Sequence, residues 1–547
     1  MHDLLHDPLI GVRTPAGVQR LSLPGLLAAL SAGQVDGYTG LRAHQADPWH
    51  VFLVQLAASI QARRPTDALP TDATYWREGL LDLADGIPEA WQLVVEDVTK
   101  PAFMQHPYCP KASYKPCAYA PDELDVLFTS KSHDVKPAKV APDDMEAWLY
   151  ALMTRQTISP YGGGGGALNG VARMNSGYGS RPFVAWVRDL HTSKRFQDET
   201  NALCRLRGSI VNAPYGYSSD RAVVLTWTHP WNSQGHQFFL RQLEPWFIES
   251  ARLIRLKRDE YQKGIFALQA GTKARQIGPK EPHKGDIGDP WIPITTEGAA
   301  LTITSPGFTP ARLCKLIFKD GISESKGLLM TSHLSDSNSW LVASVLTGGN
   351  CQTDGFYHIE LPVPAKIKRS LSQETTRKTL AHLAQHLLND AKDVQECLRI
   401  AFYVLAVEAA ENELRKKQHT TTFAALNAIQ ELSRKKEKKK AFERIDLFSR
   451  ETISALTRTW EQHYFPTLWR GADEDHETVR RNWQQRLVEA GQALLDEAAT
   501  RLPLPTNRRW RALTQAESAW RGMLHKAGLP LPGRATTEPA ETEEQTA

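Results

Sequence analysis

The segment LAHLAQHLLNDAKDVQECLRIAFYVL, residues 380–405, determines the fold of the C-terminal part of this chain. Apolar residues recur along it at spacings of three and four. The recurring residues are Leu380, Leu383, Leu387, Ala391, Val394, Leu398, Ala401 and Leu405. Such spacing places all of them on one face of a single long helix.

Further helical patterns follow this segment, over roughly residues 421–439, 441–462, 477–500 and 508–527. Long helices in succession with short connections predict an antiparallel bundle. The preceding sequence instead mixes short β-like runs, helices, and breaks at Pro and Gly. We therefore expect an α+β protein in three parts. These are a large irregular mixed N-terminal domain over 1–365, a helical bundle over 366–530 and a disordered polar tail over 531–547.

Local patterns refine the N-terminal domain. Strands are predicted over Leu4–Arg13, Val18–Leu23, Phe183–Val187, Ala222–Trp227 and Leu301–Thr304, and helices over Trp49–Arg63, Thr74–Ala84 and Asp143–Gln156. The strand predictions rest on β-branched and aromatic runs bounded by turn residues. The helix predictions rest on apolar periodicity and, at Asp143, on acidic residues suited to a helix N-terminus.

Composition excludes several classes of protein. The chain has 547 residues, 41% of them hydrophobic, and a formal charge of only +4, so any nucleic-acid surface must be a local patch. No signal-peptide pattern and no membrane-spanning run are visible. Six cysteines without a CxxC pair predict neither a disulfide framework nor a zinc site. We expect a cytoplasmic protein with no membrane contact and no cofactor or metal ion.

A run of five glycines is the first candidate site. It lies in YGGGGGALNG, residues 161–170, and comprises Gly162, Gly163, Gly164, Gly165 and Gly166. Glycine lets the backbone approach a ligand closely, and exposed N–H groups then meet phosphate or a groove edge. No GK[ST] follows, so this is not a Walker A loop. A flexible linker is the alternative.

A lysine-rich loop is the second candidate. TSKSHDVKPAKV, residues 129–140, contains Lys131, His133, Lys136 and Lys139. These side chains suit the phosphates and bases of an extended nucleic-acid strand. An ordinary solvated loop is the alternative.

A hairpin is the third candidate, in GGNCQTDGFYHIELPVP, residues 348–364. The pattern predicts a turn at Gly348–Gly349, a polar tip formed by Gln352, Thr353 and Asp354, and a strand over Phe356–Val363. Such a tip suits contact with groove edges or insertion at a base step. A simple surface turn is the alternative.

Other features bear on binding or catalysis. Basic clusters occur at Arg434–Lys440 and in ARLIRLKRDE, residues 251–260, and charge runs are more often solvated surfaces. His-Asp dipeptides at His2, His6 and His133 raise the alternative of a metal-dependent nuclease or phosphohydrolase. No motif supports catalysis, so we predict that the chain is not an enzyme and assign no catalytic residue. A purely structural scaffold of a ribonucleoprotein is a further alternative.

Several segments taken in order resemble the CasA family, the large subunit of the type I-E CRISPR Cascade surveillance complex. They are LLHDPLIGVRTPAGVQRLSLPGLL (4–27), PAFMQHP (101–107), the glycine run with SGYGSRPFVAW (176–186), GDPWIPITTEGAALTI (288–303), GGNCQTDGFYHIELPVP (348–364) and YFPTLW (464–469). The resemblance runs along the chain to about residue 500.

This resemblance implies a role and a set of residues. The family's large subunit reads the protospacer-adjacent motif of double-stranded DNA with a glycine loop, a lysine and a wedge hairpin. On this chain the glycine loop corresponds to Gly162–Gly166 with Asn169, and the wedge to Gln352, Thr353 and Asp354. The groove-reading lysine has no counterpart in residues 293–303, so we expect Lys280 or Lys284 to substitute and contact the nucleic-acid backbone.

The resemblance also implies partners. These are the other Cascade subunits, the 5′ handle of the CRISPR RNA, double-stranded target DNA and the helicase-nuclease effector. The loop with Lys131, His133, Lys136 and Lys139 corresponds to a family loop that contacts the RNA handle or neighbouring subunits. The wedge starts strand separation, and the subunit later supports recruitment of the helicase-nuclease.

Overall fold

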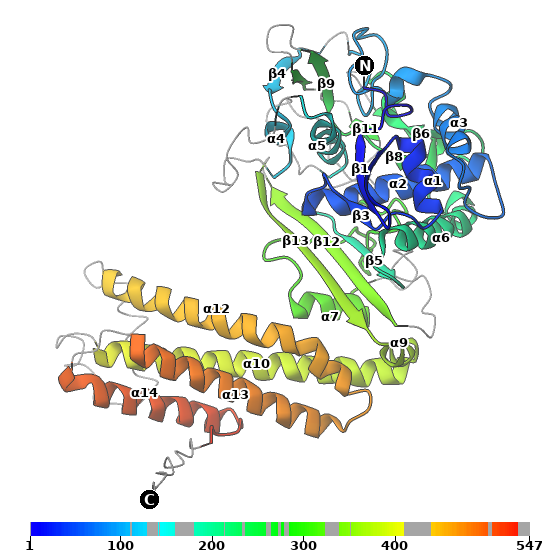
Figure 1. Ribbon diagram of the computed structural model, residues 1–547. Coiled ribbons are helices and arrows are strands. Elements are labelled where there is room, and N and C mark those ends of the chain that lie inside the picture. Colours follow the sequence, from blue (N-terminus) through cyan, green and yellow to red (C-terminus); the bar gives the residue numbers. More distant parts are fainter. Residues whose placement is uncertain are drawn as a thin grey trace, which may run out of the picture. The chain divides into compact units, whose positions relative to one another are not determined.

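The computed structural model, drawn in Figure 1, divides into two compact units, Met1–Lys368 and Arg369–Ala547. The residues that it describes are 2–109, 112–127, 141, 143–158, 180–212, 214–231, 236–258, 264–271, 275–277, 284–322, 338–349, 352–409, 439–501 and 506–533. Strands and helices build the first unit, and the described part of the second is helical, which confirms the α+β class. The boundary expected after residue 365 lies at the start of α9 (Ala365–Ser372). Most of the expected tail lies outside the described residues.

The first unit begins with a small β-sheet. β1 (Ile10–Thr14) pairs antiparallel with β2 (Gly17–Leu21), and β3 (Gly37–Tyr38) joins the other edge of β1. Gly17, at φ +116°, supplies the positive φ of the turn. The predicted strand over Leu4–Arg13 began too early. Residues 4–7 form turns, because the Asp3 carboxylate accepts a hydrogen bond from the Leu5 amide at 2.8 Å.

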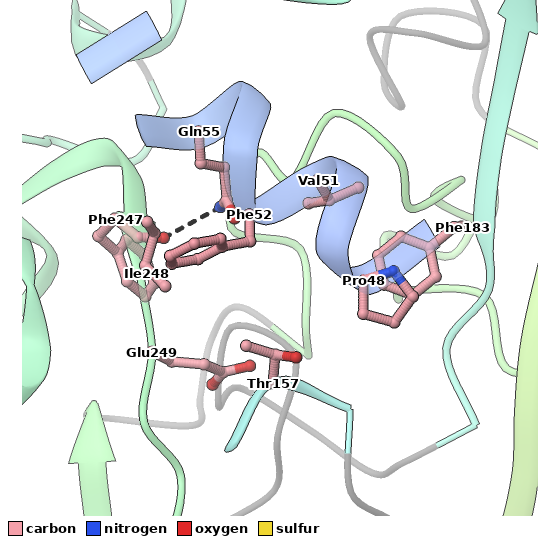
Figure 2. Close-up of a pocket in the computed structure, with 9 residues that line it drawn as sticks. All are labelled: Pro48, Val51, Phe52, Gln55, Thr157, Phe183, Phe247, Ile248 and Glu249. Atoms are coloured by element: carbon pink, nitrogen blue, oxygen red, sulfur yellow. Dashed lines mark hydrogen bonds between the residues drawn. The ribbon is translucent and has the colours of Figure 1, made fainter. Parts of the chain in front are cut away.

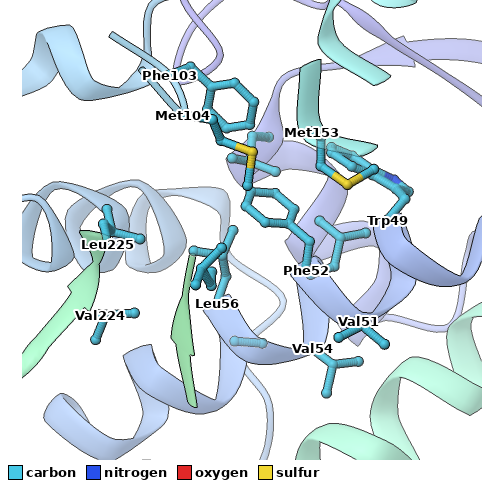
Figure 3. Close-up of a cluster of buried hydrophobic side chains, with 14 of the residues drawn as sticks. Trp49, Val51, Phe52, Val54, Leu56, Phe103, Met104, Met153, Val224 and Leu225 are labelled. Carbon is cyan, nitrogen blue, oxygen red and sulfur yellow. The ribbon is translucent and has the colours of Figure 1, made fainter. Parts of the chain in front are cut away.

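Helix α2 (Ala43–Arg63) runs through the centre of this unit and is buried on nearly every side. It packs against α3 (Ala73–Leu83), α5 (Met145–Thr157), α6 (Thr192–Asn212) and β8 (Leu243–Ile248). Near its start, Pro48 shares a small cavity with Phe183 (Figure 2). Further along, Phe52 packs edge-on against Phe103 at 5.8 Å between ring centroids (Figure 3). A helix buried all round is a rigid support for the elements that surround it.

Small sheets and short helices complete the described part of this unit. Their bounds are α1 (Leu23–Ser31), β4 (Lys115–Ala118), α4 (Pro121–Leu124), β6 (Val223–Leu225), β7 (His236–Phe238), β9 (Leu253–Arg258), β10 (Ile265–Ala270), β11 (Arg275–Ile277) and α7 (Pro310–Phe318). The sheet orders are β4-β10-β9, β11-β7 and β6-β8. The strand predicted over Ala222–Trp227 is shorter, because Thr226–Thr228 form a 3₁₀ turn.

A long hairpin forms the remaining sheet of the first unit. β12 (Ser339–Gly349) pairs antiparallel with β13 (Gln352–Val363), and β5 (Phe183–Val187) joins the free edge of β12. The strand predicted over Leu301–Thr304 is wrong. That segment makes isolated backbone hydrogen bonds, such as Ile303 N–H to Ser180 O at 2.9 Å, rather than a ladder.

The second unit is a bundle of long helices: α10 (Glu374–Ala409), α12 (Lys439–Arg470), α13 (His476–Arg501) and α14 (Thr506–Lys526). All eight residues of the apolar face predicted over 380–405 are buried. The helix predicted over 421–439 falls almost wholly outside the described residues. Among the described helices, none is both long and apolar enough to cross a bilayer.

Cross-helix hydrogen bonds give the direction of the bundle helices. The Tyr464 hydroxyl donates to Ala384 O at 2.9 Å, and Gln395 Nε2 donates to Thr457 Oγ1 at 2.7 Å. Partner numbers fall on α12 as they rise on α10, so these two helices run antiparallel, as predicted. The Trp483 indole of α13 donates to Leu387 O at 2.9 Å and ties a third helix to α10.

Candidate nucleic-acid interface

The described residues include only part of the predicted site. Gly162–Gly166 and Asn169, the loop residues Lys131, His133, Lys136 and Lys139, and Lys280 lie outside them. Inside them are Lys284, the backbone of Gln352, and the residues Thr353 and Asp354. The described residues that flank the predicted stretches therefore carry the geometry of the site.

The hairpin ends two residues later than the sequence predicted. Gly348 and Gly349 belong to β12, where they pair with Thr353 and Gln352, so the strands are joined through residues 350–351. The register shifts after Thr347, which pairs with Gly355, and Asp354 is left as the bulge residue. A bulge bends a hairpin and increases its twist. The direction of the last two residue pairs therefore depends on what holds them.

Thr353 points into the protein rather than toward the hairpin tip. Its side chain is buried, and its hydroxyl donates to Val126 O at 2.5 Å. The prediction that Thr353 presents its side chain at a polar tip is wrong, because the β13 register turns that side chain toward the segment before residue 128. Thr353 thus anchors the hairpin end beside the start of the lysine-rich loop.

The Val126 carbonyl is itself held firmly. The neighbouring Asp125 carboxylate accepts from Gln45 Nε2 at 2.6 Å and lies 2.7 Å from His44 Nε2, both on α2. Burial alone would raise the pKa of Asp125, but the His44 hydrogen bond and nearby Arg42 outweigh it and lower that pKa. A charged Asp125 therefore fixes this segment to the central helix.

Ser180 anchors the other strand of the hairpin end. Its hydroxyl donates to Gly348 O and accepts from Gly348 N–H, both at 3.0 Å. Its carbonyl accepts from Ile303 N–H at 2.9 Å. Ser180 has φ +65°, which is uncommon for a residue with a Cβ. It directly follows SGYG (176–179), so the chain leaves the glycine-rich stretch at a fixed point beside the hairpin end.

The chain also enters the glycine-rich stretch at a fixed point. Gln156, near the end of α5, is fully buried. Its side chain donates to Met104 O at 2.7 Å and to Arg252 O at 3.1 Å, and accepts from Arg252 N–H at 2.8 Å. Thr157, which follows Gln156, lines a cavity of about 20 Å³ together with Phe183 (Figure 2). The cavity has room for about one water molecule.

Lys284 is exposed, and its segment contacts the residues that follow the glycine-rich stretch. Its carbonyl accepts from Ala300 N–H at 3.2 Å. The next residue, Gly285, has φ +89°, and a Cβ there would lie 2.6 Å from Nη2 of Arg181. Arg181 follows Ser180 in sequence, so the Lys284 segment packs against the exit of the glycine-rich stretch. Lys284 is thus the member of the predicted lysine pair whose place near the exit of the glycine-rich stretch is described.

The middle of the hairpin is docked on α2 by charge. His358 of β13 places Nδ1 3.5 Å from Asp47 Oδ2 and Nε2 3.2 Å from Glu360 Oε1. Asp47 also accepts from Arg195 Nη1 of α6 at 2.9 Å, and Arg195 pairs with Glu199. The contact with Asp47 raises the pKa of His358 against the effect of burial. The hairpin is therefore attached to the central helices at its middle as well as near its end.

Three solved structures resemble this chain along nearly its whole length. Cse1 from Acidimicrobium ferrooxidans is 14% identical with a TM-score of 0.58, and 96% of this chain covers 98% of that one. CasA (Cse1) from Thermus thermophilus is 13% identical with a TM-score of 0.56, over 96% and 99% of the chains. A chain of a CRISPR RNA-guided surveillance complex is 12% identical with a TM-score of 0.54, over 95% and 99%.

This chain has the Cse1 (CasA) fold. The resemblance noted from the sequence is thereby confirmed at the level of the fold. No protein-family model matches the sequence, and no curated protein matches it.

The motifs that carried the resemblance hold the Cse1 fold together. Gln105 of PAFMQHP is buried, donates to Leu93 O at 2.8 Å and accepts from Leu256 N–H at 2.7 Å. The Trp291 indole of GDPWIPI donates to Glu199 Oε2 at 2.8 Å. Motifs whose residues are buried and hydrogen-bonded in this way indicate the fold more directly than they indicate binding.

The basic cluster in β9 is largely structural. Arg252 and Arg255 are buried, and Arg255 donates to three backbone carbonyls: Lys100 O at 2.9 Å, Val95 O at 3.0 Å and Asp97 O at 3.1 Å. Buried guanidinium groups with these partners are not available to phosphate. Arg252 and Arg255 therefore add no basic surface to the candidate interface.

The His-Asp dipeptides give no support to the alternative of a metal-dependent enzyme. His6 Nδ1 lies 3.1 Å from Asp3 Oδ2, and Asp7 accepts from the Asp3 amide at 2.8 Å, so these groups close the N-terminal turns. His133 lies outside the described residues. Within the described ranges, no three His, Cys, Asp or Glu side chains are grouped as a metal site.

Sequence reasoning missed the anchors of this interface. Ser180 and Val126 carry no motif of their own, and hydrogen bonds join them to residues 168 and 227 positions away. The available signals were indirect: Ser180 follows a glycine-rich stretch, and Thr353 lies near a predicted turn. Neither spacing indicates a partner so distant in sequence.

Proposed function

We propose that this chain is the large subunit of a type I-E CRISPR RNA-guided surveillance complex. In this role it recognises a short protospacer-adjacent motif in double-stranded DNA and starts strand separation. The observation that supports this most is that residues flanking two of the predicted stretches are hydrogen-bonded to the end of the third, the hairpin. Thr353 joins the hairpin end to Val126, and Ser180 joins it to the exit of the glycine-rich stretch. The Cse1 fold supports the same role.

The chemistry of these stretches suits weak readout of DNA. Glycine backbone and short polar side chains in a minor groove distinguish base pairs poorly, because the groove presents a degenerate pattern. Poor discrimination allows many sites to be sampled and released, while pairing with a guide RNA supplies sequence specificity. A net charge of +4 also fits a subunit whose neighbours hold most of the nucleic-acid backbone.

The hairpin end suits insertion between base steps. Separating stacked bases requires a rigid element, because side chains on a rigid element keep their position when they insert between the bases. Hydrogen bonds hold the Gly348–Thr353 pair from both strands, and the His358–Asp47 pair fixes the middle of the hairpin to α2. In this proposal Gln352 and Asp354 contact the opened step, and Lys284 contacts the backbone.

The proposed partners follow from the same role. The loop over residues 129–140 contacts the 5′ handle of the guide RNA or a neighbouring subunit. The assembled complex then supports recruitment of the helicase-nuclease. Catalysis is assigned to that effector and not to this chain.

A binding experiment with the reconstituted complex tests the proposal. Duplex DNA carrying one protospacer with randomised flanking bases is incubated with the complex, with and without this chain, and bound DNA is sequenced. We expect a defined flanking motif to be enriched only when the chain is present. Equal binding and equal flanking sequences in both samples would contradict the proposal.

A pair of glutamine variants localises the effect. Gln352→Ala, at the hairpin end, is expected to weaken motif-dependent binding by roughly tenfold, the loss of about 1–3 kcal/mol of base contacts. Gln19→Ala, on the exposed β2 strand of another hairpin, is the matched control and is expected to bind like wild type. Equal effects of the two substitutions would exclude the β12–β13 hairpin as the reading element.

A further inference from the structure

One residue pair near the end of the hairpin, Gly348 with Thr353, is held by a hydroxyl hydrogen bond on each of its two strands. Gly348 of β12 and Thr353 of β13 are direct cross-strand partners. Ser180 Oγ bonds to both the N–H and the carbonyl of Gly348, and Thr353 Oγ1 donates to Val126 O. The two contacts come from segments separated by more than fifty residues, so one residue pair is fixed from two independent directions.

The position of this pair matters because it follows the bulge. Asp354 is the extra residue of the bulge, and it separates the Gly348–Thr353 pair from the Thr347–Gly355 pair. A bulge bends the strand and increases its local twist, so the pairs beyond it point in a different direction from the strands before it. Contacts from outside the hairpin to those pairs therefore bear on the direction of the hairpin end.

Ser180 is held in a conformation that its own chemistry disfavours. Its φ of +65° is in the left-handed region, its exposed fraction is 7%, and glycine would adopt the same backbone without strain. Non-glycine residues persist in this region where the surroundings over-determine them, often at functional sites. At Ser180 the hydroxyl is what glycine lacks, and that hydroxyl makes both contacts to Gly348.

We propose that Ser180 and Thr353 are positioning residues that fix the direction in which the hairpin end meets duplex DNA. This inference rests on the proposed function and adds which side chains make the hairpin end effective. Through the hairpin end, the two hydroxyls affect the rate at which the DNA strands separate. They do not contact the DNA themselves, because both side chains are turned into the protein.

Amide hydrogen exchange on the full chain without nucleic acid tests the geometric part. In Ser180→Gly, which relieves the backbone strain and removes both hydrogen bonds of the hydroxyl, we expect residues 348–356 to exchange faster by at least about fivefold, the effect of losing a single hydrogen bond. Thr353→Val is expected to speed exchange over the same residues, including Gly348, although the hydrogen bonds between Gly348 and Ser180 are intact in that variant. Thr353→Ser retains the hydroxyl and should restore wild-type exchange. Unchanged exchange in Ser180→Gly and Thr353→Val would overturn the inference.

A strand-opening assay tests the functional part. The assembled complex is mixed with duplex DNA that carries 2-aminopurine beside the motif, and the rise in fluorescence is followed. We expect Ser180→Gly and Thr353→Val to open DNA about tenfold more slowly, with normal assembly and rescue by Thr353→Ser. Ser305→Ala is the matched control, because Ser305 contacts the same hairpin at the Tyr357 hydroxyl, 3.0 Å away, rather than at the Gly348–Thr353 pair, and should open DNA like wild type.

The outcomes separate the two ideas. Wild-type opening rates in Ser180→Gly and Thr353→Val, with faster exchange at the hairpin end, would overturn this inference and leave the proposed function intact. If the complex binds and opens DNA equally well with and without this chain, the proposed function is overturned, and this inference with it. Slow opening in Ser180→Gly and Thr353→Val, with a wild-type opening rate in Thr353→Ser, supports both ideas.

Discussion

Arg255→Lys distinguishes a structural role from a binding role for the basic strand β9. A lysine keeps the positive charge, so any phosphate contact at this position would largely survive. It does not keep the planar fork that lets one guanidinium reach three carbonyls in different directions. Those carbonyls belong to Val95, Asp97 and Lys100, at 2.9–3.1 Å. If the role is structural, the substitution lowers stability without a specific loss of nucleic-acid binding.

The magnitude follows from the hydrogen bonds that a lysine cannot make. The bond to Val95 O is fully buried, and a buried acceptor left without a donor costs about 1–3 kcal/mol. The bonds to Asp97 and Lys100 are only partly buried, so water replaces the guanidinium at one of them with a loss of about 1 kcal/mol. Burial lowers the pKa of Arg255, and a lysine ammonium in the same place gains no new partner. We expect a total loss of about 2–4 kcal/mol in the free energy of unfolding.

Urea unfolding of the full chain, followed by tryptophan fluorescence, measures this loss. With a slope of about 3 kcal/mol per molar urea, the midpoint of the first unit should fall by roughly 1 M. Arg258→Lys is the control, because Arg258 ends the same strand and is exposed. Its midpoint should stay within about 0.2 M of wild type. The reasoning is refuted if the urea midpoint of Arg255→Lys equals that of Arg258→Lys.

Two further predictions concern charged contacts, one in each unit. Because Asp47 raises the pKa of His358, this contact stabilises the first unit fully below the ordinary histidine pKa and is lost as pH rises through the folded-state value. The urea midpoint of wild type relative to His358→Gln should therefore fall as pH rises above the ordinary histidine pKa of about 6.5, and a constant difference would contradict this. In the bundle, Asp390→Ala removes a buried carboxylate that Arg480 contacts twice at 2.8 Å, and thermal or urea unfolding should show a loss of about 1–3 kcal/mol. Glu474→Ala removes an exposed ion pair and should change stability by less than about 0.5 kcal/mol, so equal losses would show that burial is not the deciding factor.

The helical bundle could be predicted because its signal is local. Residues 380–405 repeat at helical spacing, and one buried face follows from that repeat whatever the helix packs against. The β12–β13 hairpin was predicted for a similar reason, since an apolar strand follows a pair of glycines. Its register was not, because the pairing of Gly348 and Gly349 and the bulge at Asp354 are determined by interactions on the flanks of the hairpin. A shift of this size is enough to turn Thr353 from the expected tip into the protein.

The candidate site shows the same division. Glycine-rich and lysine-rich stretches stand out in the sequence because their composition is unusual. Ser180 does not stand out, although its hydroxyl makes two hydrogen bonds to the hairpin end. Arg252 and Arg255 mislead in the opposite sense, because their charge is visible in the sequence and their burial is not. Composition therefore indicated which stretches suit binding but not which residues hold them.

The sequence by itself determined the α+β class, the amphipathic helix over residues 380–405, the hairpin strands and the ordered motifs that resemble the CasA family. These features depend on periodicity, turn chemistry and residue type within short windows. Only the tertiary structure decided that the ends of three separate stretches meet at Gly348 and Thr353. The physical reason is that these interactions are single hydrogen bonds between residues far apart in the chain. Their partners become neighbours only after α2 and the β12–β13 sheet have packed, so no local pattern encodes them.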